Sequence, residues 1–336
     1  MKKKKTLLIP LLLIPILLLT TLILLPEEPE PFTSPLYFTF VIHTEEDINK
    51  YGVEKENNMD YDGDEELLLH ATMTMRELAE IAQNHGVKIN FGTDWTFANG
   101  VELYDPTFFT DLESMGHEID AHAHESHILY SEVREDIISA GGTPTQIASG
   151  LTEDEIYEKM EYFDTYYPDF TTLWGVSLAG HELGEVIAGN VWRPSREDWT
   201  QHDKNGDYIY IGHGEYANSI NYIENAINNR KENQINTYAV FTNPRHFKAS
   251  KASTIDDKWT AKESSYEYYE TRLEWWDNFF TELDTYVESG KVEYVTLTEI
   301  SEIFIEQENQ LIFTDEEIPR SEEALTSLNE QEGYKL

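Results

Sequence analysis

The chain has 336 residues, 40% of them hydrophobic, with 24 Lys and Arg against 64 Asp and Glu, a formal net charge of -40 at pH 7. Such an acidic surface repels phosphate backbones, so the composition argues against nucleic-acid partners; it is typical of a protein kept soluble in high salt or living outside a cell. The sequence has no cysteine, which excludes disulfides, thiolate metal sites and a cysteine nucleophile.

The N-terminus predicts a membrane anchor. "MKKKK" precedes 20 uncharged residues at 6–25, about the length that spans a bilayer, and no small-residue cleavage site follows. We therefore expect an uncleaved transmembrane signal anchor over residues 1–25 with its lysines in the cytoplasm, a Pro/Glu linker over 26–35, and the remaining chain outside the cell. A signal peptide cut at an atypical site is the alternative, and it would also place the working domain outside.

From residue 36 onward, predicted strands alternate with predicted helices, because buried apolar runs are followed by segments of helical periodicity. In chain order these are a strand at 36–44, a helix at 65–86, a strand at 87–91, a helix at 105–116, a strand at 117–124, a helix at 152–167, strands at 173–178, 190–194 and 208–212, a helix at 216–230, a strand at 237–243, a helix at 263–288, a strand at 292–297 and a helix at 298–306. This alternation predicts an α/β fold with a mainly parallel sheet, closed into a barrel of seven or eight β/α units over residues 36–306. The remaining residues, 307–336, read as an acidic tail.

Polar clusters follow four of the predicted strands. They are "HTEED" (43–47), "HAHESH" (122–127), "WRPSR" (192–196) and "TNPRHF" (242–247). Because the carboxyl ends of parallel strands gather at one end of a barrel, we expect these four clusters to lie on the same face.

The histidine-rich cluster predicts a metal site. Two or three imidazoles with one carboxylate are a typical set of ligands for Zn²⁺ or another divalent first-row metal. On a strand, His122 and His124 point to the same face, and His127 can turn back from the following loop. A solvated histidine-rich loop is the alternative. His117, at the start of the strand, is expected to cap or pack.

The acidic triplet Glu45, Glu46 and Asp47 supplies carboxylates at the end of the first strand. One of them is expected to bind the metal, and a second to act as general base toward a metal-activated water. For the triplet taken alone, a solvated turn is the alternative reading.

Several segments, taken in order, resemble the polysaccharide deacetylases, which are metal-dependent carbohydrate esterases with an irregular (β/α) barrel. They are "FTFVIHTEED", "HGVKINF", "LESMGHEIDAHAHESH", "VWRPSR" and "GKVEYVTLTEISEIF". The block from "GHEI" to the histidines is the most specific of them. The resemblance spans residues 36–306 and implies the barrel fold of that family.

The resemblance also implies metal ligands. His122 matches the first metal histidine of the family. The second would fall on Ser126, so His124 and His127 remain alternatives for it. The spare candidates elsewhere in the chain are His181 and His213.

For the catalytic groups, the resemblance implies that Asp47 is the metal carboxylate and Glu46 the base, with Glu45/Glu46 as the alternative register. Arg193 resembles the arginine that orients the base. His246 stands where the family keeps a histidine acid, although the usual leucine motif is missing.

The activity implied by the resemblance is hydrolysis of an acetyl group on a polysaccharide or cell-envelope glycan, assisted by one divalent metal, with zinc as the first choice. "WW" at 275–276 fits a groove that stacks on sugar rings. Two other readings stay open. One is a catalytically inactive barrel that binds glycan or scaffolds the envelope, and the other is an amidohydrolase acting on a non-sugar C–N bond.

Overall fold

The computed structural model describes residues 33–44, 61–123, 128–151, 167–175, 188–197, 201–214, 219–242 and 266–313. The chain divides into two compact units, Met1–Phe32 and Thr33–Leu336, and every described residue belongs to the second. No helix within the described ranges is long and apolar enough to cross a membrane. The predicted anchor, residues 1–25, lies outside those ranges.

The described part of the chain forms one sheet flanked by helices. Its strands are β1 (Leu36–His43), β2 (Ile89–Thr93), β3 (Glu118–Ala121), β4 (Ile147–Leu151), β5 (Thr172–Gly175), β6 (Val191–Trp192), β7 (Ile209–Gly212), β8 (Asn236–Thr242) and β9 (Val292–Tyr294). The helices are α2 (Glu65–Asn84), α3 (Trp95–Tyr104), α4 (Phe108–Ser114), α5 (Tyr130–Ser139), α8 (Ile220–Asn228), α9 (Tyr266–Glu288), α10 (Leu297–Gln307) and the short 3₁₀ helix η4 (Glu308–Gln310).

The sheet is mainly parallel and nearly closed. Its strand order is β6-β7-β5-β4-β3-β2-β1-β8, with β9 also paired to β1, and within this order only β6 and β7 pair antiparallel. The two ends of the order meet, because Gly189, just before β6, bridges Thr237 of β8. In addition, the amide of Ala239 donates to the carbonyl of His213, just after β7, at 2.9 Å. The predicted irregular α/β barrel is confirmed.

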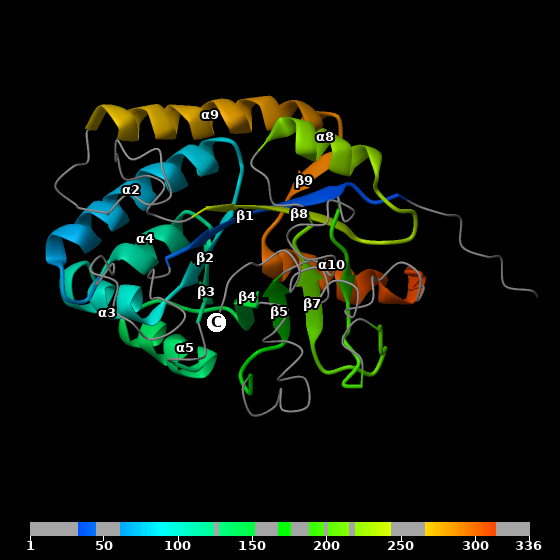
Figure 1. Cartoon of the computed structure of the whole chain (residues 1–336), viewed down its shortest axis with the longest axis horizontal. Helices are drawn as coiled ribbons and strands as arrows, with labels where there is room; N and C mark the ends of the chain where they lie inside the picture. Colours follow the sequence, from blue (N-terminus) through cyan, green and yellow to red (C-terminus); the bar gives the residue numbers. More distant parts are fainter. Residues whose placement is uncertain are drawn as a thin grey trace, which may run out of the picture. The chain divides into compact units, whose positions relative to one another are not determined.

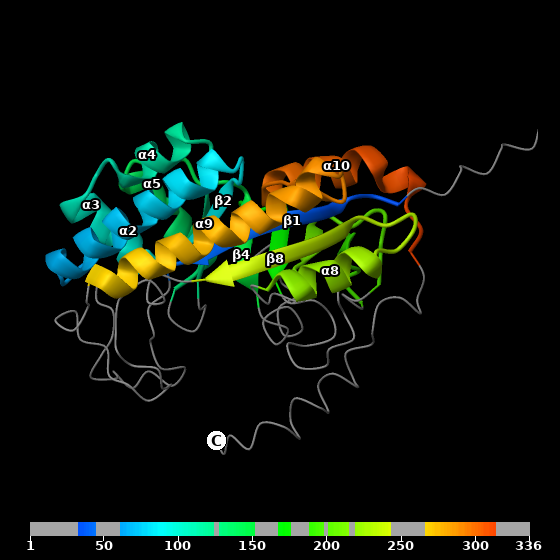
Figure 2. The ribbon, with the colours of Figure 1, turned by 90° about the horizontal axis from the view of Figure 1, so that it is seen from above.

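Alternate residues of β1 face opposite sides of the sheet and enter two hydrophobic cores. Phe40 faces outward and packs on Trp276 and Phe280 of α9, with ring centroids 4.6 and 5.4 Å apart. Val41 faces inward and belongs to a smaller cluster with Ile300 of α10. Figures 1 and 2 show α9 running alongside α2 over β1. A strand buried on both faces reads as a continuous apolar run, which is why β1 was predictable from the sequence.

Helix α10 closes the barrel at the end where the parallel strands begin. The amide of Leu297 donates to Asn90 Oδ1 at 3.2 Å, and Asn90 lies near the start of β2. The amide of Thr298 lies 3.4 Å from Glu118 Oε2, at the start of β3. Thr296 begins the helix with a capping box formed with Glu299. A site open to ligands must therefore lie at the opposite end, where the parallel strands finish.

Three described elements were not predicted, and one segment packs where a tail was expected. Helices α3 and α5 and strand β4 were missed; β4 reads Ile-Ala-Ser-Gly-Leu, and its small residues carry little strand propensity.

In the predicted tail, the amide of Ile312 donates to the carbonyl of Asn233 at 2.9 Å. Phe313 stacks on His202 with ring centroids 3.6 Å apart. Residues 307–313 thus pack on the barrel because their apolar side chains find a surface there.

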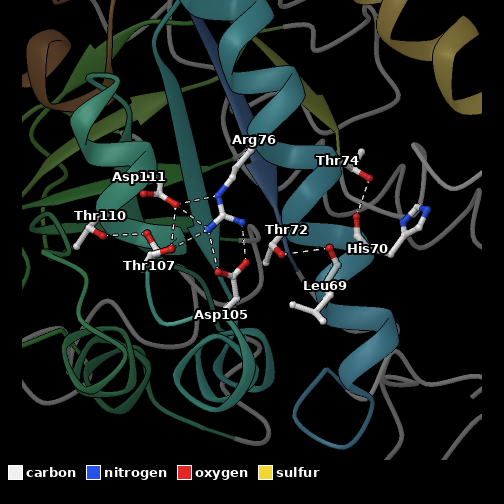
Figure 3. A network of polar contacts seen from close by, with 9 residues as sticks. All are labelled: Leu69, His70, Thr72, Thr74, Arg76, Asp105, Thr107, Thr110 and Asp111. Atoms are coloured by element: carbon white, nitrogen blue, oxygen red, sulfur yellow. Dashed lines mark hydrogen bonds and ion pairs between the residues drawn. The ribbon is translucent and has the colours of Figure 1, made fainter.

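Arg76 of α2 joins that helix to the segment leading into α4 (Figure 3). Its guanidinium binds Asp105 through two parallel hydrogen bonds of 2.6 and 2.9 Å, and it also binds Asp111 at 2.8 and 3.0 Å. The Thr107 hydroxyl donates to the same Asp111 oxygen at 3.0 Å. Burial alone would raise the pKa of Asp105, but the Arg76 guanidinium outweighs burial and holds that pKa below its ordinary value. One cation therefore compensates two neighbouring carboxylates.

We expect Arg76→Lys to destabilise the protein by about 2 kcal/mol, because an ammonium group cannot reproduce the planar, two-sided contact with both carboxylates. Chemical denaturation followed by circular dichroism measures this loss. Arg196→Lys is the matched control, since the Arg196–Asp207 pair is largely exposed and contributes little. Equal effects of the two substitutions would contradict a special role of Arg76.

His85, the C-cap of α2, links that helix to α9. Its Nδ1 lies 2.7 Å from Asp284 and its Nε2 lies 3.0 Å from Asp277. Burial lowers the pKa of His85, but the two carboxylates outweigh burial and raise it above its ordinary value. Both ring nitrogens can donate only in the protonated ring, so the geometry is that of an imidazolium between two aspartates.

The stability that this pair contributes should depend on pH. A histidine with a raised folded pKa stabilises in full below its unfolded pKa of about 6.5, and the contribution disappears as the pH rises through the raised value. We expect thermal unfolding to show His85→Gln less stable than the parent below pH 6.5, with a difference of about 1 kcal/mol or less because the pair is partly exposed. The gap should close toward pH 9. A gap that is independent of pH would contradict the charged pair.

Candidate active site

Three histidines lie at the end of the barrel where the parallel strands finish. His43 is the last residue of β1, His122 follows β3 directly, and His213 follows β7 directly. All three are buried, with 5%, 2% and 6% of their surfaces exposed. The barrel therefore gathers imidazoles from segments far apart in the sequence, as expected for the site-bearing end of such a fold.

His43 and His122 stack on each other. Their ring centroids are 3.9 Å apart and their planes are inclined by 20°. Strand β2 lies between the strands that carry them, and its residue opposite His43 is Gly92. A Cβ atom at position 92 would lie 2.3 Å from Cδ2 of His43. The glycine therefore leaves the space through which the His43 ring reaches across β2.

Strand β4 supports both rings through a local irregularity. Its register with β5 shifts between Ser149 and Leu151, and Gly150 has a φ of +88°, in the left-handed region that favours glycine. A Cβ at position 150 would lie 2.4 Å from Cε1 of His43 and 2.6 Å from Nδ1 of His122. Backbone conformation and space thus both require glycine here.

Ser149 contacts both imidazoles. Its carbonyl oxygen accepts a hydrogen bond from Nδ1 of His122 at 2.7 Å and another from the Tyr130 hydroxyl at 3.1 Å. Its hydroxyl lies 3.0 Å from Nε2 of His43. A carbonyl only accepts, so Nδ1 of His122 is the donor, and in the neutral tautomer the lone pair is then on Nε2. Metal-binding histidines are typically held in this way by their other ring nitrogen.

Aromatic side chains surround the stacked pair. Trp174 of β5 meets His43 edge-on, with centroids 5.6 Å apart, and Phe241 of β8 meets it at 4.8 Å. Trp174 also lies 5.9 Å from His213, on its other side. The indole Nε1 of Trp174 is buried and has no acceptor among the described residues. The site therefore combines polar nitrogens with an apolar surround.

Two described histidines, His122 and His213, have Nδ1 on a main-chain carbonyl, which is the hydrogen-bond pattern of a metal ligand. No group of three His, Asp or Glu side chains within the described ranges is arranged to hold a metal. Apart from Arg193 and His213, the other residues predicted for the site lie outside those ranges. They are Glu45, Glu46, Asp47, His124, Ser126, His127, His181 and His246.

His117 packs as expected. Its Nδ1 accepts a hydrogen bond from the amide of Ile89 at 3.0 Å, and its Nε2 donates to the carbonyl of Ala79 at 3.2 Å. Burial lowers the pKa of His117 to about 4. The ring is therefore neutral, and both of its nitrogens are used to join β2 and β3 to α2.

Arg193 lies at the other end of the barrel. Because β6 runs antiparallel to β7, the residue after β6 sits where β7 begins, away from His122. The Arg193 guanidinium donates to Glu308 of η4 at 2.7 Å and lies over the Phe304 ring at 5.6 Å. The expectation that "WRPSR" shares a face with the histidines is therefore wrong. That expectation assumed that the strand before Arg193 runs parallel to its neighbour. The direction of a strand cannot be deduced from two or three consecutive apolar residues.

Sequence reasoning also missed four residues of the site. His43 is the first residue of "HTEED", but the sequence predicts no role for it. Gly92, Ser149 and Gly150 belong to no predicted motif, and the last two lie on the unpredicted strand β4. A glycine inside a strand signals a bulge or a close approach, and this signal was available at position 150 only once β4 was recognised.

No model of a known protein family matches the sequence, and no curated protein matches it. Among solved structures, the chain is similar to a Mycobacterium smegmatis protein assigned as a polysaccharide deacetylase, with 11% identity and a TM-score of 0.47 over 87% of this chain and 94% of that one. It is similar to the Puue allantoinase, with 12% identity and a TM-score of 0.46 over 83% and 93% of the two chains.

A third similar structure is the 4-alpha-glucanotransferase from Thermococcus litoralis, with 12% identity and a TM-score of 0.47. That match covers 80% of this chain and 40% of the other, so this chain spans less than half of that enzyme's length. The activities named for these proteins differ. A proposal for the function must therefore be based on the residues at the open end of the barrel and not on these similarities.

Proposed function

We propose that the protein is a metal-dependent hydrolase that removes acetyl groups from an extracellular or cell-envelope glycan. The observation that carries the proposal is the state of His122. It is buried directly after β3, and its Nδ1 lies 2.7 Å from the Ser149 carbonyl, so the neutral ring directs its lone pair to Nε2. Metal-binding histidines are typically oriented in this way by a hydrogen bond from the other ring nitrogen.

The remaining ligands follow from the sequence. Asp47 comes three residues after Thr44, the last described residue beyond β1, and a chain advances at most about 3.5 Å per residue. The Cα atom of Asp47 can therefore be no farther than about 11 Å from that of Thr44. His124 and His127 follow His122 within five residues. We propose Asp47, His122 and one of His124 and His127 as ligands to a single cation, with zinc as the first choice.

Each residue then has a chemical task. These ligands would hold a divalent cation, which would supply Lewis acidity toward an acyl oxygen and toward water. Glu46 is proposed to take the proton of the attacking water, and His246 to return a proton to the leaving group. The buried Nε1–H of Trp174 is proposed as a donor to a substrate oxygen. Arg193 is not included, because it lies at the other end of the barrel.

The glycan substrate and the location outside the cell rest on the sequence. The block "LESMGHEIDAHAHESH" resembles enzymes that deacetylate polysaccharides, and the apolar segment at 6–25 predicts export and anchoring. The apolar surround made by Trp174 and Phe241 is compatible with a sugar ring but also with other acyl substrates. For this reason the test must separate sugar from non-sugar amides.

The first test is metal analysis of the full-length protein purified in detergent, combined with acetate release from acetylated chitooligosaccharides and peptidoglycan fragments. We expect about one equivalent of a divalent transition metal, and acetate release that stops with a chelator and returns with Zn²⁺. A protein that takes up no metal and releases no acetate would contradict the hydrolase and favour the inactive barrel. A metal-loaded protein that hydrolyses only non-sugar amides would contradict the glycan assignment alone.

A further inference from the structure

We propose that Ser149 and His43 are positioning residues that clamp the ring of His122, Ser149 from its edge and His43 from its face. The proposal rests on the proposed function only in taking His122 as a metal ligand. Neither Ser149 nor His43 belongs to the ligand and catalytic set that the sequence predicted. The clamp would fix the direction of the His122 lone pair before any cation arrives.

The edge of the His122 ring is fixed by the bulge in β4. The register of β4 shifts directly after Ser149, where Gly150 adopts the left-handed conformation, and the Ser149 carbonyl faces Nδ1 of His122. Tyr130 donates to the same oxygen, so the carbonyl is held from a second side. A bulge that re-aims one main-chain group beside a site is a known use of this irregularity.

The face of the His122 ring is covered by His43, and the stacking excludes a shared cation. A metal bound by imidazole lies close to the plane of the ring, at about 2 Å from the nitrogen. Two planes inclined by 20° and separated by 3.9 Å meet only about 10 Å away, far beyond that bond length. His43 therefore supports His122 and does not bind the same ion beside it.

Ser149 connects the two parts of the clamp. Its hydroxyl contacts Nε2 of His43 at 3.0 Å while its carbonyl holds His122. His43 is further enclosed by Trp174 and Phe241. Turning the His122 ring would break a 2.7 Å hydrogen bond and displace an enclosed neighbour. Such support around a ligand typically changes metal affinity by 10- to 100-fold when it is removed.

The test compares His43→Phe, which keeps a flat ring on His122, with His43→Ala, which removes it. Metal affinity is measured by chelator competition with Zn²⁺, and ligand geometry by the visible absorption of the Co²⁺-loaded protein. We expect His43→Phe to bind metal within about threefold of the parent, and His43→Ala to lose about 10- to 100-fold with an altered Co²⁺ spectrum. Thermal unfolding in chelator shows whether each variant is folded.

Ser149→Ala provides a second route, because it keeps the carbonyl and removes only the hydroxyl that holds His43. We expect it to weaken metal binding by about tenfold. Unchanged affinity in both His43→Ala and Ser149→Ala would overturn the clamp. A His43→Phe variant that keeps its metal but loses kcat with KM unchanged would also overturn it, because His43 would then take part in the chemistry. If His122→Ala keeps its metal, the proposed function fails instead, whatever the His43 variants do.

Discussion

Replacing His122 with alanine is expected to remove the bound metal and to lower kcat/KM for acetyl release by about 10³-fold or more, which corresponds to about 4 kcal/mol of transition-state stabilisation. Nδ1 of this imidazole is held by a main-chain carbonyl, as is typical of a metal ligand. The fold should survive, because the Ser149 carbonyl keeps its hydrogen bond from Tyr130 and is not left unpaired.

The matched control for this substitution is His202→Gln. His202 is a partly buried histidine that stacks on Phe313 beside Glu308, at the end of the barrel that α10 closes. We expect the control to keep both metal and turnover. Elemental analysis after dialysis and steady-state kinetics measure the two effects. Full metal content and activity in His122→Ala would remove the basis of the proposed site.

Lowering the ionic strength is expected to destabilise the protein markedly. The net charge of -40 is spread over one chain, and like charges that are unscreened favour expansion. The screening length falls from about 10 Å at 0.1 M salt to about 3 Å at 1 M, which is shorter than the spacing of most surface charges. We expect Tm to rise by about 10 °C between 0.1 M and 2 M NaCl, equivalent to a few kcal/mol in a domain of this size.

A cluster formed by α5 and Glu102 of α3 allows this effect to be tested locally. Burial, together with the charges of Glu102, Glu132 and Glu135, raises the pKa of Asp136. Asp136→Asn should therefore stabilise the protein at pH 7 and low salt, and the part of this gain that comes from the neighbouring carboxylates should vanish at 2 M NaCl. Sucrose at matched osmolality is the control for nonspecific exclusion effects. A Tm that is insensitive to salt, in parent and variant alike, would show that the acidic surface serves solubility alone.

The sequence predicted correctly those features that depend on residues close to one another in the chain. The continuous apolar run of β1 and the helical period of α2 predicted those elements, because a buried face must recur every second or every third to fourth residue. "GHEIDAHAH" placed His122 at a strand end. The neutral, packed role of His117 was also predictable from its place at the start of the same strand.

The sequence failed where structure depends on pairing between distant segments. Strand β4 is too short and too poor in β-branched residues to stand out, yet Ser149 and Gly150 on it hold both imidazoles. Strand β6 has only two residues, and its antiparallel direction carried Arg193 to the wrong end for the predicted role. Neither the presence of β4 nor the direction of β6 produces a hydrophobic periodicity that can be recognised in the sequence.

By itself, then, the sequence determined the class of fold, the acidity of the surface and the presence of imidazole and carboxylate groups after particular strands. Tertiary structure alone decided that His43 reaches His122, because this contact needs β2 between the two strands, a glycine at position 92 and a bulge at Gly150. The physical reason is that hydrophobic period records which face of an element is buried. Strand order, strand direction and the close approach of two rings arise only when distant segments pair.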